Sequence, residues 1–229
     1  APIANGLSPF GRAVVAEMNR IGMIVDVAHV SDATMAAVLD TSKASVIASH
    51  SDARALADAP RNIPDALLRR IGANGGVVMV NCYPAFLSSE WRAWDADRTA
   101  YAGSVGVVAN IYGPRSPAPL IAWDASHPAP PVTPVMVADH IEHIVRVAGH
   151  GAVGFGGDYD GINGTGPEGM AGVDGYPLVL AEQVRRGWSD VDLAALTSGN
   201  ILRVMERVEA VAKSLSATLP DDSIDPLAR

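Results

Sequence analysis

The feature of this sequence that most restricts its fold is the alternation of short apolar runs with longer segments of helical periodicity. Four runs have the length and composition of strands buried on both faces, namely "MIVDVAH" at 23–29, "ASVIASH" at 44–50, "GVVMVNCY" at 76–83 and "AVGFGGDYD" at 152–160. Parallel strands need a crossover connection, usually a helix, so the alternation predicts an α/β domain with a parallel sheet. Two architectures fit this pattern: a doubly wound sheet and a (β/α)8 barrel.

The loops after these strands disfavour a nucleotide-binding fold. The segment "DVAHVSD" at 26–32, which follows the first strand, contains no glycine and cannot form a Gly-rich phosphate loop. The later run "GFGGDYDG" places its glycines inside the predicted strand, and Asp158 would repel a phosphate.

Helix signals separate the strands. Ser8 and Pro9 begin a helix that Gly22 ends, and Ser31 caps a second helix. Further helices are expected over 62–76, 86–102, 135–149, 177–187, 189–197 and 199–215. The Pro- and Gly-rich segment 103–134 is expected to be an ordered surface excursion without a regular element, with His127 a solvated loop residue. We expect one domain portion over 1–217 and a lightly docked tail at 218–229.

Composition excludes several classes of protein. The net charge of −8 and the charged fraction of 18% argue against nucleic acid or an anionic membrane surface as the main partner. Cys82 is the single cysteine, so it can form neither an intrachain disulfide nor a Cys-based zinc site, and we expect it to fill the core. No apolar run approaches the ~20 residues of a transmembrane helix.

Three of the four predicted strands end on a residue able to bind a metal: His29, His50 and Asp158. The carboxyl ends of parallel strands point to one face of a domain, so these side chains can converge. Neutral imidazoles and a carboxylate suit a zinc-type cation, which lowers the pKa of a bound water. The alternative is that each is a polar residue satisfied at a strand end, without a ligand.

The remaining histidines are read as structural. His140 and His143 are three residues apart on a predicted helix, where metal binding is possible in principle. With the neighbouring Asp139 and Glu142 they instead predict a solvated helix face. His150 lies at a helix–strand turn and is expected to be structural.

The loop after His50 carries a candidate substrate-binding residue. The guanidinium of Arg61 is suited to a bidentate contact with a substrate carboxylate, although an exposed loop arginine explains it equally well. Asp160 is expected to support Asp158 or shape its loop. The sequence from Asn163 to Thr165 fits a glycosylation acceptor, a pattern that also occurs often by chance.

Long motifs resemble one known family. "GLSPFGRAVVAEMNRIGMIVDVAHVSDATM", "VIASHSDARALADAPRNIPD", "VGFGGDYDGI" and "PEGMAGVDGYPLVLAEQVRRGWSDVDLAALTSGNILRV" closely resemble the membrane (renal) dipeptidase family, peptidase family M19, of the amidohydrolase-like metallo-barrels. The resemblance covers nearly the whole chain apart from 103–134 and the tail.

The resemblance implies a (β/α)8 TIM-type barrel that hydrolyses dipeptides with a two-zinc centre. It places His29 and His50 as ligands of one zinc ion, through the motifs "D-x-x-H-x-S" and "S-H-S". It places Arg61, in "R-N-x-P-D", on the C-terminal carboxylate of the substrate. Asp158, in "G-G-D-[FY]-D-G", would contact the substrate and handle the proton.

The sequence also departs from the family pattern. An opening H-x-D strand, a bridging glutamate and a histidine in an "L-T-x-H" segment are absent, and four strands are found where a barrel needs eight. We therefore expect this chain to supply the C-terminal half or more of the barrel. The N-terminal segment of the same protein would supply the remaining metal ligands, and this chain alone would be inactive.

Two other functions remain open: a related metallohydrolase of other amides, such as a β-lactam or a cyclic imide, and a non-catalytic family member. The resemblance further suggests a homodimer and a periplasmic or extracellular location, neither of which a residue pattern here identifies.

Overall fold

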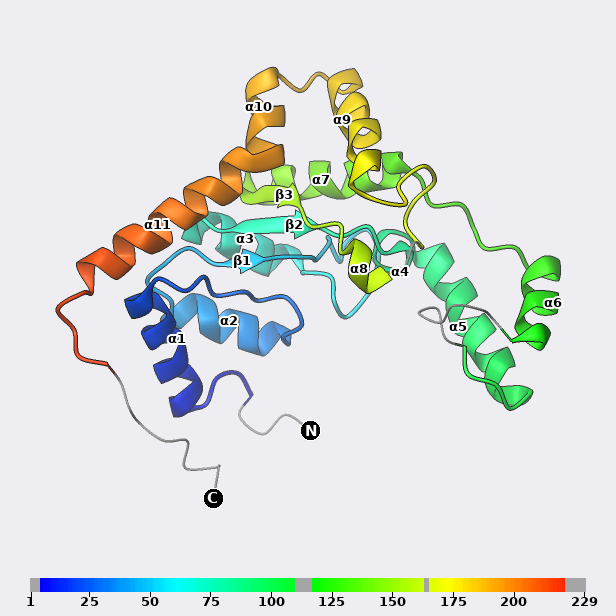
Figure 1. Cartoon of the computed structure of the whole chain (residues 1–229), viewed down its shortest axis with the longest axis horizontal. Coiled ribbons are helices and arrows are strands. Elements are labelled where there is room, and N and C mark those ends of the chain that lie inside the picture. Colours follow the sequence, from blue (N-terminus) through cyan, green and yellow to red (C-terminus); the bar gives the residue numbers. More distant parts are fainter. Residues whose placement is uncertain (1–4, 110–116, 163–164, 221–229) are drawn as a thin grey trace.

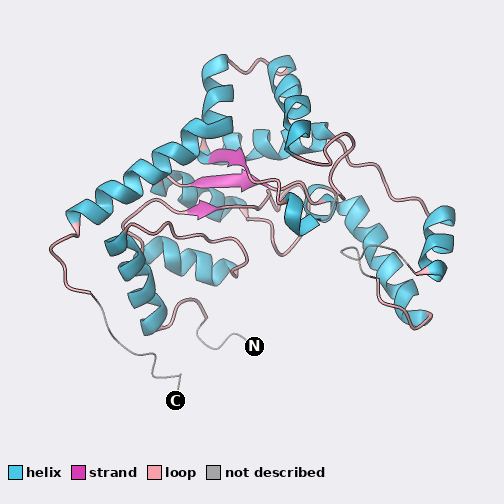
Figure 2. Ribbon diagram, in the orientation of Figure 1, coloured by secondary structure: helices cyan, strands magenta, loops and turns pink. Residues whose placement is uncertain are grey.

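A small parallel sheet forms the centre of the molecule. The structure, a computed structural model, describes residues 5–109, 117–162 and 165–220. Its strands are β1 (Ile47–Ala48), β2 (Val77–Val80) and β3 (Val153–Phe155), in the order β1-β2-β3 and all parallel (Figures 1 and 2). The predicted parallel sheet is therefore present.

The first predicted strand, 23–29, contributes less than expected. Asp26 forms a single parallel bridge with Ile47, supported by one hydrogen bond on each side of it. Val27 N donates to the Ile47 carbonyl at 2.7 Å and Ile47 N donates to the Val25 carbonyl at 3.0 Å. The segment thus lies beside β1 and runs parallel to it, as a fourth strand would. Its hydrogen-bonded pairing with β1 is too short to form a regular strand.

The helices follow the predicted alternation closely. Their bounds are α1 (Pro9–Ile21), α2 (Asp32–Thr41), α3 (Asp65–Asn74), α4 (Pro84–Leu87), α5 (Ser89–Ser104), α6 (Ala118–Ser126), α7 (Pro134–Ala148), α8 (Tyr159–Ile162), α9 (Tyr176–Arg185), α10 (Asp190–Ala194) and α11 (Asn200–Ser214). Short 3₁₀ turns lie at His150–Ala152 and Val173–Gly175, and a π-helical turn, Ala195–Gly199, joins α10 to α11.

The helix starts agree with the sequence signals. The Ser8 hydroxyl accepts a hydrogen bond from Gly11 N at 3.0 Å at the start of α1, and Gly22 ends that helix with φ of 77°. Ser31 caps α2 in the same way, accepting from Thr34 N at 3.2 Å. The second cap matters for the site, because Ser31 lies two residues after His29 and the helix α2 begins at the next residue.

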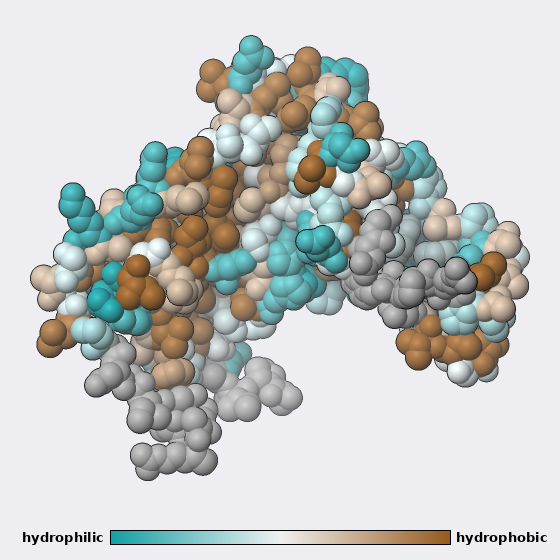
Figure 3. Space-filling view, in the orientation of Figure 1, coloured by the Kyte–Doolittle hydropathy of each residue, from teal (hydrophilic) through white to brown (hydrophobic). Residues whose placement is uncertain are grey.

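The two faces of the sheet are covered unequally. On one face α3 and α7 pack against the strands and form the main core, which includes Leu68, Ile71, Ile141 and Ile144. On the other face, a smaller cluster of buried residues joins Ala44 and Val77 to Val204 and Val208 of α11. Figure 3 shows hydrophobic residues gathered beside α11 on the surface in view.

The segment 103–134 differs from the prediction, because it contains the helix α6. Pro119 lies in the first turn of α6, where a missing N–H costs nothing, so the prolines begin this helix rather than prevent it. Residues 110–116, also within this segment, lie outside the described part of the chain.

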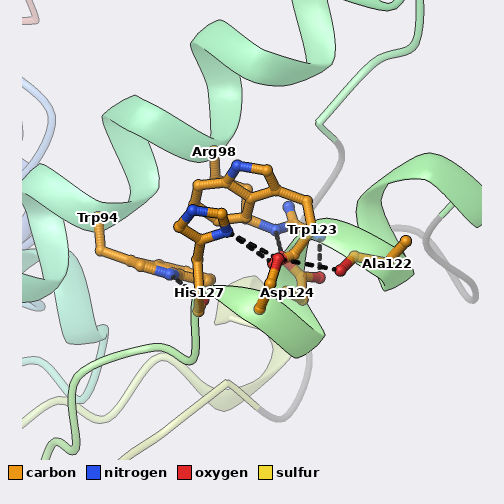
Figure 4. Close-up of polar contacts among 7 residues, drawn as sticks. Trp94, Arg98, Ala122, Trp123, Asp124 and His127 are labelled. Atoms are coloured by element: carbon orange, nitrogen blue, oxygen red, sulfur yellow. Dashed lines mark hydrogen bonds and ion pairs between the residues drawn. The ribbon is translucent and has the colours of Figure 1, made fainter.

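Side chains between α5 and α6 hold this excursion together (Figure 4). Arg98 Nε donates to Asp124 Oδ1 at 2.7 Å, and Trp94 Nε1 donates to the His127 carbonyl at 2.7 Å. The His127 ring stacks on Trp123 with centroids 4.4 Å apart. His127 is exposed, as predicted, but its ring is part of an aromatic contact.

The prediction that His140 and His143 lie on a solvated helix face is wrong. Both are buried in α7, with exposed fractions of 1% and 6%. His140 Nδ1 accepts from Ala53 N at 3.1 Å, and His143 Nε2 lies 2.7 Å from Asp65 Oδ1 on α3. The pattern misled because α7 packs against α3 on one side and α9 on another, so that little of its surface faces water.

The smaller predictions have mixed outcomes. Cys82 is buried with a free thiol, as expected, and burial raises its pKa to about 12. His150 Nδ1 lies 3.3 Å from Asp192 Oδ1 on α10.

The predicted glycosylation acceptor includes residues 163 and 164, which are outside the described residues, as is the tail from 221 onward. Within the described ranges, no helix is both long and apolar enough to span a bilayer.

Candidate active site

The predicted site residues come from the carboxyl edge of the sheet. His29 follows the segment that bridges to β1, His50 lies two residues beyond β1, and Asp158 lies three residues beyond β3. His29 and Asp158 have positive φ angles of 63° and 59°, a conformation uncommon for residues other than glycine. Such backbone is often found at functional sites, where the surrounding structure maintains it.

The two histidines contact each other directly. Their Nε2 atoms are 2.7 Å apart, and their ring centroids are 4.8 Å apart with an interplanar angle of 58°. These two Nε2 atoms are therefore the pair of ring nitrogens that could bind one metal ion together.

Arg61 completes a three-residue cluster with the histidines. Its Nη1 lies 2.9 Å from His29 Nδ1 and its Nη2 donates to the His50 carbonyl at 3.4 Å. The guanidinium carbon also lies 5.4 Å from the centroid of the Phe86 ring, a cation–π distance. The sequence-based grouping of His29, His50 and Arg61 thus corresponds to direct contacts.

Hydrogen-bonding rules assign a proton to each contact of this cluster. A guanidinium only donates, so His29 Nδ1 accepts from Arg61 and the proton of a neutral His29 is on Nε2. That proton is donated to His50 Nε2, which places the His50 proton on Nδ1.

The chain of hydrogen bonds ends on a carboxylate. His50 Nδ1 donates to the Ser49 hydroxyl at 2.7 Å, and that hydroxyl donates to Asp26 Oδ2 at 2.5 Å. The other oxygen of Asp26 accepts from Ala28 N at 2.9 Å and Ser49 N at 3.1 Å. Asp26 and Ser49 therefore set the orientation of the His50 ring and leave its Nε2 as an acceptor.

The surroundings of His29 favour the neutral form of its imidazole. Burial lowers the pKa of its imidazole below the ordinary value, and the positive charge of Arg61 lowers it further. A neutral imidazole is the form that binds metals.

Asp158 lies in the same hollow as His50. A cavity of about 440 Å³ is lined by residues that include Ser49, His50, Asp158, Tyr159, Asp160 and Tyr176. Asn81 Nδ2 donates to Asp158 Oδ2 at 3.4 Å. Asp160 is exposed in α8, two residues after Asp158, and both roles expected of it stay predictions.

Two nitrogen donors suit zinc, but they are fewer than a complete site needs. Among the residues that the structure describes, no group of three or more His, Cys, Asp or Glu side chains is placed to hold a metal ion. This chain therefore offers a pair of imidazoles, to which further ligands would have to be added.

Sequence reasoning did not assign roles to Asp26, Ser49, Asn81 and Asp52. A polar residue inside an apolar strand is the available signal, since Asp26 interrupts "MIVDVAH" and Ser49 precedes His50. Asp52 is fully buried, and burial raises the pKa of its carboxyl well above the usual range. Its Oδ1 accepts a hydrogen bond from Asn81 N at 3.2 Å, and Asn81 is the residue whose side chain donates to Asp158.

Two curated proteins that are similar to this chain are named dipeptidases. The chain is 39% identical over 226 residues to the dipeptidase aclJ of Aspergillus oryzae. The aligned region covers 98% of this chain and 44% of that protein. The chain is 34% identical over 222 residues to human dipeptidase 3, covering 97% of this chain and 37% of the relative. The chain thus spans less than half the length of these curated relatives.

Solved structures agree with the fold. The probable dipeptidase PvdM from Pseudomonas aeruginosa matches with a TM-score of 0.75 and 29% identity, over 93% of this chain and 57% of that structure. A metallopeptidase from Rhodobacter sphaeroides, bound to a phosphinate mimic of the dipeptide L-Ala-D-Ala, matches with a TM-score of 0.65 and 27% identity, over 89% of this chain and 48% of the other. The predicted fold class, a (β/α)8 barrel of which this chain forms a part, is confirmed by these likenesses.

The family assignment rests on a match along nearly the full chain. The model of the membrane dipeptidases, peptidase family M19, matches residues 2–219 and includes the described site residues His29, His50, Arg61 and Asp158. The chain belongs to the membrane dipeptidase family.

Proposed function

We propose that this chain is the C-terminal part of a zinc-dependent dipeptidase whose N-terminal segment completes the barrel. The observation that carries the proposal is the cluster of His29, His50 and Arg61, in direct contact at the carboxyl edge of the sheet. This cluster combines two metal-binding nitrogens with a cation suited to a carboxylate.

His29 and His50 would hold one of two zinc ions through their Nε2 atoms. When bound, zinc supplies an activated water and polarises the peptide carbonyl. Binding through Nε2 requires His29 to carry its proton on Nδ1, which then cannot accept from Arg61. Arg61 has to give up this hydrogen bond, and its guanidinium can turn to the C-terminal carboxylate of a dipeptide.

Asp158 is the proposed proton carrier. Its carboxylate borders the same hollow as His50, so it can accept the proton of the attacking water and transfer it to the leaving amine. The hydrogen bond from Asn81 holds the carboxylate in place at 3.4 Å.

The uneven cover of the sheet supports a further segment. Ile47 and Met79 lie on the face packed with α11 and are only partly buried there, as is Ile24 beside them. Parallel sheets are usually covered on both faces. We propose that the N-terminal segment of the same protein covers this face and supplies the remaining metal ligands.

The test uses the protein with its complete natural sequence. We expect about two zinc ions per molecule and hydrolysis of simple dipeptides, with both lost on chelation. Turnover of a β-lactam or cyclic imide in place of dipeptides would indicate the related amide hydrolase. Bound metal with no hydrolysis of any of these would indicate a non-catalytic member.

Comparing acid and amide substrates tests the role of Arg61. The variant Arg61→Ala should raise the KM of a dipeptide by roughly 10–100-fold, since a hydrogen bond between charged groups contributes about 1.5–3 kcal/mol. The KM of the corresponding dipeptide amide, which has no terminal carboxylate, should change little. Equal KM values for the dipeptide in both proteins would exclude this role.

A further inference from the structure

Arg61 lies on a loop that another arginine holds by its backbone. The side chain of Arg54 donates from Nε to the Asn62 carbonyl at 2.8 Å and from Nη2 to the Pro60 carbonyl at 3.2 Å. These two carbonyls belong to the residues on either side of Arg61. One guanidinium therefore restrains the peptide groups that flank the proposed carboxylate-binding residue.

The same guanidinium is tied to the loop of His29. Arg54 Nη1 and Nη2 lie 2.5 and 2.8 Å from the two oxygens of Asp32, a bidentate ion pair. Asp32 is the first residue of α2, three residues after His29 and directly after the Ser31 cap. The Arg54–Asp32 pair thus joins the segment that delivers His29 to the segment that delivers Arg61.

The backbone near Arg54 strengthens this link. Ala53 forms a parallel bridge with Ile63, Arg54 N donates to the Ile63 carbonyl at 3.0 Å, and Ile63 N donates to the Asp52 carbonyl at 2.7 Å. The loop that carries Arg61 is therefore closed at its base by backbone hydrogen bonds and at its tip by the Arg54 side chain. The Arg54 side chain is 24% exposed and that of Asp32 is 46% exposed, so this link is partly shielded from solvent.

We propose that Arg54, held by Asp32, is a positioning residue that sets the place of the Arg61 guanidinium against His29. It touches neither the histidines nor the hollow beside Asp158, and it acts through the Pro60 and Asn62 carbonyls. For substrate binding, the inference rests on the carboxylate-binding role proposed for Arg61. For the position of Arg61, it stands on the contacts alone.

Arg70 offers a matched control that contacts the same helix, α2. Its Nη2 donates to Asp40 Oδ1 at 2.6 Å and to the Ala36 carbonyl at 3.1 Å, farther along that helix. This pair also joins an arginine to an aspartate of α2, but these contacts do not involve the loop of Arg61. Comparing Arg54→Ala with Arg70→Ala therefore separates the position of Arg61 from a general loss of an ion pair.

The kinetic experiment measures KM and kcat of the zinc-loaded full natural protein on a dipeptide and on its amide. Arg54→Ala should raise the dipeptide KM by about 10–100-fold, because displacement of a binding group by about 1 Å has effects of this size. The amide KM and the kcat of both substrates should change less than about threefold, and Arg70→Ala should leave all of them unchanged. Equal losses on dipeptide and amide, or none on either, would overturn the proposal.

Crystal structures of the variants give a second measurement that needs no activity. In Arg54→Ala the contact between Arg61 Nη1 and His29 Nδ1 should be lost in the metal-free protein, whereas Arg70→Ala should retain it. An unmoved Arg61 overturns the inference even if the protein is a dipeptidase. A displaced Arg61 in a protein that hydrolyses no dipeptide would support the positioning role and refute the proposed function. If Arg54→Ala does not fold, Asp32→Asn is tested in its place, with the same displacement expected to a smaller degree.

Discussion

His29 and His50 are 21 residues apart in sequence, yet their Nε2 atoms lie 2.7 Å apart at the carboxyl edge of the sheet. The segment around Asp26 pairs in parallel with β1, and this explains the proximity, because both segments then end at the same edge of the sheet. The local backbone also contributes, since the positive φ of His29 turns the chain sharply before Ser31 begins α2.

Replacing either histidine should remove metal. We expect His29→Ala and His50→Ala each to lower the zinc affinity of the full natural protein at least tenfold, since each deletes one of the few nitrogen ligands. His127→Ala is the control, because that ring stacks on Trp123 in the α5–α6 excursion. Metal content is measured by elemental analysis after dialysis against a zinc buffer. Unchanged zinc in both histidine variants would refute the metal site.

Asp26 should control the proton of His50. In Asp26→Asn the amide can replace the acceptor Oδ2 by a donor, so the Ser49 hydroxyl would accept from the introduced amide group and donate to His50 Nδ1. The His50 proton would then move to Nε2, where it blocks a metal ligand. We expect zinc affinity to fall by about 10–100-fold.

The control for this substitution is Asp40→Asn, which neutralises an exposed carboxylate paired with Arg70. Competitive titration with a chromophoric chelator measures both variants. Equal affinities for the two variants would show that the link from Asp26 to His50 has no effect on metal binding.

The parts that the sequence predicted well depend on local pattern. The apolar runs end where the chain leaves the sheet, so His29, His50 and Asp158 could be placed on one edge before any contact was known. The grouping of Arg61 with the histidines was strengthened by the family motifs. The site roles of these residues stay predictions, whereas their proximity at this edge is a property of the structure.

The parts that it missed depend on tertiary packing. A helix with His140 and His143 beside Asp139 and Glu142 reads as polar, but Asp139 pairs with Arg186 and Glu142 accepts from the Trp188 ring nitrogen. Those partners lie after α9, and no local pattern shows that this part of the chain covers this side of α7. The link from Asp26 to His50 was missed for the same reason, because it joins two segments that are separated in sequence.

The buried His140 should make stability depend on pH. Burial lowers the pKa of His140 from 6.5 to about 4, so the folded state stays neutral where the unfolded state binds a proton. The unfolded state is therefore favoured progressively as the pH falls from about 6.5 to 4, by up to about 3 kcal/mol, and His140 has no effect above that range.

Denaturant unfolding of metal-free protein at several pH values measures this effect. His140→Gln should remove one proton's worth of the pH dependence of the free energy of unfolding between about pH 4 and 6.5. The Oδ1 atom of Asp52 lies 3.9 Å from His140 Nδ1, and burial raises the pKa of this carboxyl. Because the folded state holds the Asp52 proton more tightly, Asp52 lowers the free energy of unfolding as the pH rises. Asp52 is present in the wild type and in His140→Gln, so it contributes in this opposite direction in both proteins. Identical slopes for wild type and His140→Gln would refute the assignment.

Gly156 should be the least replaceable glycine near the site. It lies just after β3, and a Cβ at this position would collide with the Ser49 carbonyl, one residue before His50, and come within 2.8 Å of the Met79 side chain. Because the Ser49 carbonyl is backbone, it cannot rotate away. Gly156→Ala should therefore lower the free energy of unfolding by about 1–3 kcal/mol and weaken zinc binding through the displaced His50.

Gly103 is the control, since a Cβ there meets no described atom within 4 Å and the residue lies in helix α5. Gly103→Ala should raise stability by roughly 0.5–1 kcal/mol, because alanine loses less backbone entropy in a helix. Chemical denaturation and zinc titration of the two variants measure both effects. If Gly156→Ala is as stable as wild type and binds zinc equally well, then the close approach of Gly156 to the Ser49 carbonyl does not position His50.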